Sequence, residues 1–208
     1  MIGRCAAAAL ILTASCWCAS LAFSDTVDSS IPAQSHGTGE LPGESLYRLP
    51  MTLTTAAGAP MQLAVLRGTP LLVTMFYSQC TSVCPLLTMQ VQRIIGRLSS
   101  SEQRRLRVLL VSFDSTRDTP DALTAFAAEH HITADTWTIA RASASDVRLL
   151  AAALGIQYRE RADHTFNHSA VISLTDRDGV VRAQTSDLAD RQGSFISAVR
   201  RQLASPQQ

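Results

Sequence analysis

The chain contains 208 residues, of which 46% are hydrophobic and 17% are charged, and its formal net charge is +1. This length suits one domain with an ordinary hydrophobic core and some additional segments. A charge this close to zero argues against nucleic acid as a partner, because nucleic-acid binding needs a concentrated basic face. The five cysteines are an odd number, and three of them fall within the first eighteen residues. Only Cys80 and Cys84 remain for the rest of the chain.

The N-terminal 1–23 segment has the pattern of a secretory signal peptide. Arg4 is followed by an uncharged, largely apolar run from Cys5 to Phe23 that ends in small residues. The run is also close to the length of a membrane span, about 20 residues, so an uncleaved N-terminal membrane anchor is the alternative. Both interpretations predict export. Residues 24–44, rich in Ser, Gly, Pro and Thr, predict a flexible linker.

From residue 45 onward, short apolar runs alternate with amphipathic segments. The expected elements in chain order are a β-hairpin within 47–66, a strand at 70–76, a helix at 85–98, a strand at 106–113, a helix from 118 to about 130, a strand at 136–140, a helix at 144–154, a hairpin of strands 169–174 and 180–184, and a helix from about 188 to 203. This order predicts an α/β domain over residues 45–204 with a thioredoxin-like fold. Its central mixed sheet is flanked by helices and has an N-terminal β-hairpin extension. Asp118 or Thr119 is expected to cap the helix that starts with Pro120.

The cysteine pair lies where the first strong strand gives way to a helix, with three residues between Cys80 and Cys84. If this loop is wound as a helical turn, both sulfur atoms face one point, because residues i and i+4 lie on one side of a helix. Cys84, at the helix entry, is expected to have a lowered thiol pKa because of the positive end of the helix dipole. Such a pair can close a disulfide or bind a soft cation. A purely structural disulfide here would close a very small loop and add little stability through chain entropy.

A histidine could complete a metal site with these cysteines. Soft thiolates select Cu(I), with zinc as the main competitor. Two sulfurs and one imidazole suit Cu(I), whereas zinc favours a fourth ligand. His168, expected to begin the first strand of the C-terminal hairpin, could stand beside the cysteine loop, although a single histidine is more often structural. His164 is expected to be solvated in a polar loop, and His130 and His131 to lie at a helix C-terminus.

A further polar group closes the second buried strand. Asp114 is expected at the same edge of the sheet as the cysteine loop, if the strands are parallel. Its neighbours Arg117 and Asp118 suggest a local ion pair. A role for Asp114 in tuning a nearby metal ligand is the alternative.

Four segments together resemble one family. The segments are Phe76–Pro85 (FYSQCTSVCP), Ser112–Pro120 (SFDSTRDTP), Trp137 with the later Gly155–Tyr158 (GIQY), and His168–Gly179 (HSAVISLTDRDG). They resemble the corresponding segments of the SCO/SenC proteins, and the match covers roughly residues 45–204. The sequence departs from the family pattern at Thr81-Ser82, where Pro-Asp is common, and at Phe76-Tyr77-Ser78, where Gly-Tyr-Thr is usual.

The resemblance implies copper, as Cu(I) or Cu(II), bound by Cys80, Cys84 and His168, and it favours His168 over His164. It also implies a periplasmic location, soluble or tethered to the inner membrane. The implied role is that of a metallochaperone that assists assembly of the CuA centre of cytochrome c oxidase. The expected partner is the CuA subunit or another copper-accepting or thiol-bearing exported protein. On this interpretation the chain has no catalytic residue.

Two enzymatic interpretations stand beside the copper protein. The first is an exported thiol–disulfide oxidoreductase with Cys80 and Cys84 as its redox pair, which would not need His168. The second is a peroxiredoxin-like peroxidase, which needs an arginine beside the attacking thiolate. Thr81 is present, but no arginine can be placed there from the sequence.

Overall fold

The computed structural model describes residues 40–133, 135–188 and 193–205. The predicted signal peptide or anchor and most of the predicted linker lie outside the described residues. None of the helices in the described segments is both long and apolar enough to cross a membrane. The α-helices are α1 Val83–Gly96, α2 Ser100–Gln103, α3 Pro120–Glu129, α4 Ala144–Ala153 and α5 Gly193–Ala204, with short 3-10 helices at Leu46–Arg48 and Leu63–Leu66.

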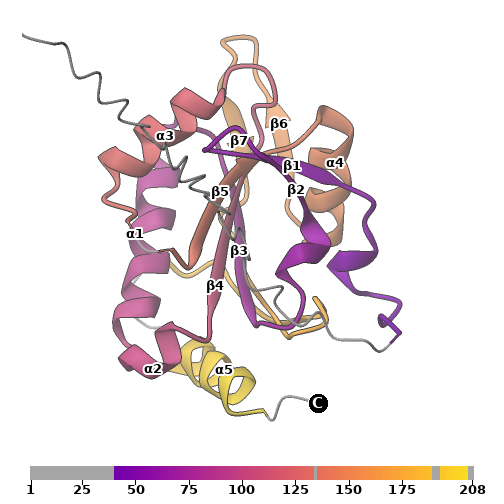
Figure 1. The fold of residues 1–208 in the computed structure, drawn as a ribbon. Coiled ribbons are helices and arrows are strands. Elements are labelled where there is room, and N and C mark those ends of the chain that lie inside the picture. The colour runs from indigo at the N-terminus through magenta and orange to yellow at the C-terminus, as the bar shows by residue number, and fades with distance from the viewer. Residues whose placement is uncertain (1–39, 134, 189–192, 206–208) are drawn as a thin grey trace, which may run out of the picture. The chain divides into compact units, whose positions relative to one another are not determined.

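The strands form two sheets. Their bounds are β1 Thr52–Thr55, β2 Pro60–Gln62, β3 Leu71–Phe76, β4 Arg107–Ser112, β5 Trp137–Arg141, β6 Tyr158–Glu160, β7 Phe166–His168, β8 Ile172–Thr175 and β9 Val181–Thr185. Seven of them make one sheet in the order β2-β1-β5-β4-β3-β8-β9, and β6 pairs with β7 in a separate ribbon. The central β3, β4 and β5 are parallel, whereas β1 and β8 join them antiparallel (Figure 1). The predicted mixed α/β sheet is therefore confirmed.

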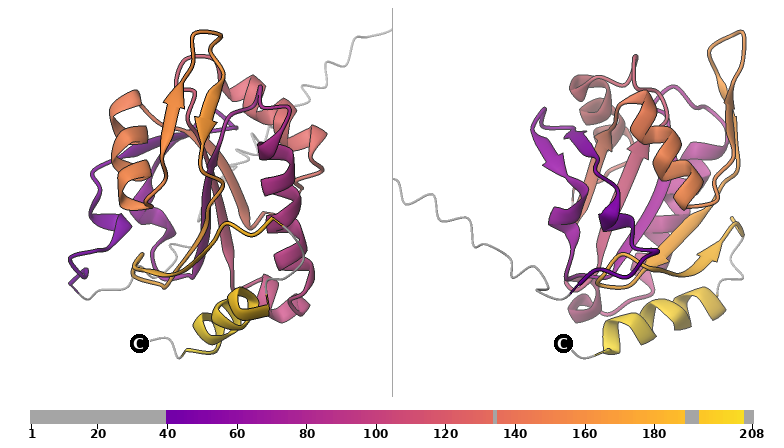
Figure 2. Two further views of the ribbon diagram at one scale, coloured as in Figure 1. Left: turned by 180° about the vertical axis from the view of Figure 1, so that it is seen from behind. Right: turned by 90° about the vertical axis from the view of Figure 1, so that its right-hand side faces the viewer.

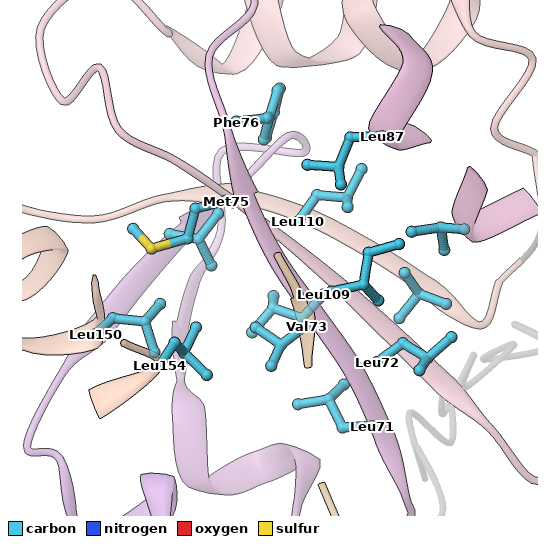
Figure 3. Close-up of a cluster of buried hydrophobic side chains, with 14 of the residues drawn as sticks. Leu71, Leu72, Val73, Met75, Phe76, Leu87, Leu109, Leu110, Leu150 and Leu154 are labelled. Carbon is cyan, nitrogen blue, oxygen red and sulfur yellow. The ribbon is translucent and has the colours of Figure 1, made fainter. Parts of the chain in front are cut away.

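The centre of the core is β3, which is buried at all six positions. Successive side chains of a strand point to opposite faces, so β3 contributes to the packing on both sides of the sheet. Phe76 lies on the same face as Leu87 of α1, while Met75 lies toward Leu150 of α4 (Figure 3). A continuous apolar run with helices on both faces is typical of a central parallel strand. This burial fixes the end of β3, from which the cysteine loop departs.

Both predicted hairpins are present, with different surroundings. β1 and β2 form an antiparallel hairpin, and β1 also pairs with β5, so the N-terminal extension is continuous with the main sheet. β8 and β9 form the C-terminal hairpin. The prediction that its first strand begins near residue 169 was wrong, because β8 begins at Ile172.

The region before β8 contains a ribbon that the sequence did not predict. β6 and β7 pair antiparallel, and the ribbon projects beyond the ends of the central strands (Figure 2). Arg159, Glu160 and Arg161 are all charged, so the segment lacks the apolar alternation that indicates a strand. The ribbon and the loop between β3 and α1 lie at the same end of the sheet (Figure 1).

Candidate metal centre

The cysteine loop joins the buried end of β3 to the first turn of α1. The backbone N–H of Cys80 donates to the carbonyl of Tyr77 at 3.2 Å, which closes a tight turn after the strand. α1 begins at Val83, two residues before the predicted start, so Cys84 lies in its first turn. Both cysteines are free thiols and both are buried, Cys80 being 6% and Cys84 0% exposed.

The helix N-terminus stabilises the first cysteine and not the second. The backbone N–H of Cys84 donates to Sγ of Cys80 at 3.4 Å. This amide belongs to the first turn of the helix, where N–H groups have no partner within the helix. The pKa of Cys80 is lowered, chiefly by the hydrogen bond from the Cys84 thiol and, against the opposing effect of burial, by hydrogen bonds from His168 and backbone amides. The pKa of Cys84 is raised by the same thiol hydrogen bond and by burial. The prediction of a lowered pKa at Cys84 was wrong, because this thiol donates to the Cys80 sulfur and is buried.

His168 is the last residue of β7 and faces the cysteines from the ribbon. Its Nε2 lies 3.5 Å from Sγ of Cys84, and its Nδ1 lies 3.2 Å from the carbonyl oxygen of Ser169. For His168 to bind a metal through Nε2, its proton would have to lie on Nδ1 and be donated to that carbonyl. In the metal-free site, the hydrogen bond to the Cys80 sulfur instead uses a proton on the side of the ring that faces the cysteines. The expectation that His168 begins a strand of the C-terminal hairpin was wrong, since it ends a strand of the ribbon.

These three side chains form a group of potential metal ligands. One donor atom each from Cys80, Cys84 and His168 lies within 4.8 Å of the other two. The two sulfurs do converge, but not through the expected helical turn, because α1 begins at Val83 and Cys80 lies in the loop before it. The donor set combines two soft sulfurs with one imidazole nitrogen, a set suited to a soft cation.

Aromatic rings, which were not predicted as part of the site, surround the imidazole of His168. The ring of Phe113, directly after β4, lies 4.9 Å from that of His168, and the ring of Tyr77 lies 6.2 Å from it. Phe113 also stacks on Tyr158 of β6 at 4.9 Å, and Tyr77 meets Phe166 of β7 edge-on at 5.1 Å. The apolar surroundings limit the access of water to the donor atoms. The only sequence signal was the position of Tyr77 and Phe113, each at the end of a buried strand.

The polar residues after β4 support the site without joining the donor group. Arg117 pairs with Asp114, and not with Asp118 as predicted, because the Asp118 carboxylate is bonded to Ser78 and Ser112. Asp114 also accepts hydrogen bonds from Thr116 and from the Arg117 backbone. Burial alone would raise the pKa of Asp114, but these hydrogen bonds outweigh it and lower the pKa. Of the two candidate caps of α3, the hydroxyl of Thr119 is the one that accepts from the Ala122 amide.

The carboxylate of Asp118 holds the cysteine loop instead of capping α3. It is 0% exposed and accepts hydrogen bonds from the backbone N–H of Ser78 at 3.0 Å and from the hydroxyls of Ser78 and Ser112. Asp118 thereby ties the start of the cysteine loop to the end of β4.

The other histidines with predicted positions lie outside the donor group. His164 is exposed, has a positive φ of 59°, and pairs with Glu160 at 2.9 Å. His130 is the C-cap residue of α3, and His131 follows it with a φ of 52°. These positions agree with the solvated and helix-terminal roles expected for them.

The fold and the site define a thioredoxin-like domain of α/β architecture with a cluster of two cysteines and one histidine. The chain belongs to the SCO1/SenC family, because the model of that family matches residues 40–204. A "Putative copper-binding protein" of Stutzerimonas stutzeri is 24% identical over 127 residues, which are 59% of this chain and 61% of that protein. The chain thus matches about three fifths of the length of this relative.

Solved structures of Sco proteins share the fold. Copper-bound ScoI from Bradyrhizobium japonicum is 22% identical, with a TM-score of 0.58 over 73% of this chain and 96% of that chain. A SCO1/SenC family lipoprotein from Bacillus anthracis is 19% identical, with a TM-score of 0.67 over 76% of this chain and 95% of that chain. The thioredoxin-like architecture predicted from the order of elements is thereby confirmed.

Proposed function

We propose that this protein is an exported copper-binding metallochaperone that assists assembly of the CuA centre of cytochrome c oxidase. The observation that carries the proposal is the convergence of Cys80, Cys84 and His168, whose donor atoms lie within 4.8 Å of one another. Membership of the SCO1/SenC family, the "Putative copper-binding protein" of Stutzerimonas stutzeri and the copper-bound ScoI structure support the choice of metal. The signal-like pattern of residues 1–23 supports export to the periplasm, soluble or anchored.

The donor set favours Cu(I) over zinc. Thiolates are soft ligands, and three donors satisfy Cu(I), whereas structural zinc sites are almost always four-coordinate. Within the described parts of the chain, the cluster contains three His, Cys, Asp or Glu donors and no fourth. Copper would pass to a partner, for which we propose the CuA subunit, by stepwise exchange of these ligands.

Binding of copper is expected to release protons. The pKa of the Cys84 thiol is raised, so at neutral pH this residue holds a proton that copper must displace. Copper affinity should therefore fall as the pH is lowered, because protons compete for the sulfur. Oxidation of the two thiols to a disulfide removes two electrons and two protons and abolishes both sulfur ligands.

Anaerobic titration of the reduced full chain with Cu(I) and Cu(II) tests the proposal. We expect about one Cu(I) per chain, with binding weakened in His168→Ala and lost in Cys80→Ser and Cys84→Ser. The matched control is His164→Ala, four residues from His168 and exposed, which should bind as the unaltered protein does. Tight stoichiometric binding that survives His168→Ala would remove this histidine from the site, and survival in both cysteine variants would end the proposal.

A second candidate function is that of a thiol–disulfide oxidoreductase, and the split between the two thiol pKa values favours it. The low pKa of Cys80 provides a thiolate that can attack a partner disulfide, after which Cys84 resolves the mixed disulfide. The partner disulfide gains two electrons from the pair and two protons, one from the Cys84 thiol and one from solvent, and Cys80 and Cys84 become a disulfide. The test is reduction of an oxidised CuA-subunit peptide by copper-free His168→Ala protein. Full activity of this variant supports the reductase, and absence of activity in the metal-free unaltered protein excludes it.

A further inference from the structure

The three metal-donor residues come from two segments of the chain that are attached to different sheets of the domain. Cys80 lies in the loop after β3 and Cys84 in the first turn of α1, while His168 lies at the end of a two-stranded ribbon outside the main sheet. The distance between His168 and Cys84 therefore depends on where the ribbon is held. Rings of Phe113 and Tyr77 pack against the ribbon near His168. The loop at its far end needs a separate attachment.

Arg117 supplies that attachment. Its Nε donates to the carboxylate of Asp114, and its Nη2 donates to the backbone carbonyl of His164 in the loop between β6 and β7. Asp114 is only 3% exposed, and the backbone N–H of Arg117 also donates to it, at 2.9 Å. The guanidinium thus bridges a fixed point after β4 and the tip of the ribbon.

The loop that Arg117 contacts is itself internally bonded. The N–H of His164 donates to the carbonyl of Arg161 at 3.0 Å, and the N–H of Arg161 donates to the carbonyl of Thr165 at 2.8 Å. Because the turn is closed in this way, a restraint on the His164 carbonyl restrains both strands. One of those strands ends at His168.

The same segment also holds the cysteine loop. The backbone N–H of Asp114 donates to the hydroxyl of Ser112 at 2.9 Å, and this hydroxyl donates to Asp118. Asp118 in turn accepts from the backbone of Ser78. Residues 112–118 therefore make hydrogen bonds to both pieces of the chain that carry donor atoms.

We propose that Arg117 is a positioning residue that holds the β6–β7 ribbon so that Nε2 of His168 stays beside Sγ of Cys84. Its guanidinium does this through simultaneous hydrogen bonds to Asp114 and to the His164 carbonyl. Arg117 touches none of the donor atoms and acts through His168 alone. The consequence for copper rests on the proposed function, whereas the restraint on the ribbon does not.

Replacing Arg117 by lysine distinguishes the effect of its two simultaneous hydrogen bonds from the effect of its positive charge. Arg117→Lys keeps a cation that can pair with Asp114, so the buried carboxylate stays neutralised. An ammonium group lacks the planar fork of a guanidinium and cannot keep both hydrogen bonds in the same geometry. The matched control is Arg161→Lys on the same ribbon, where the exposed arginine lies 3.8 Å from Asp163 and makes no bridge to β4.

The first measurement is amide hydrogen exchange in the reduced, metal-free full chain. We expect exchange of residues 158–168 to rise several-fold in Arg117→Lys, with no change in the strands of the central sheet and no change in Arg161→Lys. Unchanged exchange in the ribbon of Arg117→Lys would overturn the proposal. This measurement does not involve copper, so it tests whether Arg117 restrains the β6–β7 ribbon even if the protein binds no metal.

The second measurement is a double-mutant cycle on Cu(I) affinity, made by competition with a chelator. Arg117→Lys should lower the affinity by about tenfold, the lower end of the range for residues that orient a metal ligand. The same change in a His168→Ala background should have no further effect, because the ligand on which Arg117 acts is absent. An equal loss of affinity in both backgrounds would show a general structural defect and overturn the proposal. A failure of the unaltered chain to bind copper would instead end the proposed function.

Discussion

At the scale of single residues, the environment separates two cysteines that the sequence presents as equals. Cys80 receives hydrogen bonds from a helix N–H and from its partner thiol, whereas Cys84 points into the core. A thiolate is favoured where it accepts hydrogen bonds, and a buried thiol that donates to a neighbouring thiolate keeps its proton. Cys80 is therefore the thiolate of the pair and Cys84 the thiol.

This asymmetry predicts which thiol reacts first. In the reduced, metal-free protein, alkylation at pH values well below the ordinary cysteine pKa of about 8.5 should modify Cys80 and leave Cys84 intact. Cys84→Ala removes the hydrogen bond that lowers the Cys80 pKa most, so the pH profile of Cys80 alkylation should move to higher pH. Mass spectrometry of alkylated peptides across a pH series measures both effects.

The control for this prediction is Cys80→Ala. Burial alone still disfavours the Cys84 thiolate in that variant, so Cys84 should remain unreactive near neutral pH. Preferential labelling of Cys84 in the unaltered protein would contradict the assignment of the thiolate to Cys80.

At the scale of elements, the site depends on how loops are attached to the sheet. Asp118 joins the cysteine loop to the end of β4, and Phe113 packs the ribbon against the same strand end. Parallel strands bring their carboxyl ends to one edge, which is why β3 and β4 deliver both groups to one place.

Removing the Asp118 carboxylate should destabilise the whole domain. Asp118→Ala leaves the Ser78 amide and the Ser112 hydroxyl buried without their acceptor, at an expected cost of about 3 kcal/mol in the free energy of unfolding. Asp118→Asn should cost less, because the amide oxygen can still accept one of these bonds. Denaturant unfolding of the reduced protein measures both variants.

Asp121→Ala is the matched control, since Asp121 is exposed in the first turn of α3. This variant should leave the unfolding free energy nearly unchanged. A loss in Asp118→Ala no larger than that in the control would show that the buried hydrogen bonds do not hold the loop.

At the scale of the whole molecule, segments far apart in the sequence close the end of the domain opposite to the ribbon. The Leu46 N–H donates to the carbonyl of Gly179 at 3.0 Å, and Arg67 pairs with Asp178 at 2.9 Å. Gly179 has a φ of 79°, and a Cβ at this position would lie 2.7 Å from the ring of Tyr47. The turn of the C-terminal hairpin is thus packed directly against the start of the domain.

Gly179→Ala should therefore lower the thermal stability of the domain. The alanine would suffer both an unfavourable backbone conformation and a clash with the buried Tyr47 ring, for a loss of about 1–3 kcal/mol. Gly96→Ala is the control, because Gly96 ends α1 with open space around it, and alanine favours helix. Thermal unfolding should show a lower midpoint for Gly179→Ala and an equal or higher one for Gly96→Ala. Equal midpoints for the two variants would contradict the close packing.

The sequence by itself determined the α/β class, the order of the main elements and the three residues of the candidate site. Apolar runs such as Leu71–Phe76 are strong local signals, and the spacing of Cys80 and Cys84 at the end of a strand already suggested that the two sulfurs meet. The residues around the two histidines already placed His164 in a solvated polar loop and His168 at the start of a strand, and the family resemblance then selected His168 as the ligand. The structure places His168, and not His164, beside the cysteines.

Only the tertiary structure decided which thiol is ionised, which strand carries His168 and which residues hold the two halves of the site together. The roles of Asp118, Arg117 and the rings around His168 arise from contacts between residues up to about a hundred positions apart, and local pattern does not encode such contacts. The thiol pKa values also depend on burial and on individual hydrogen bonds, which exist only after the sheet has brought these segments to one edge.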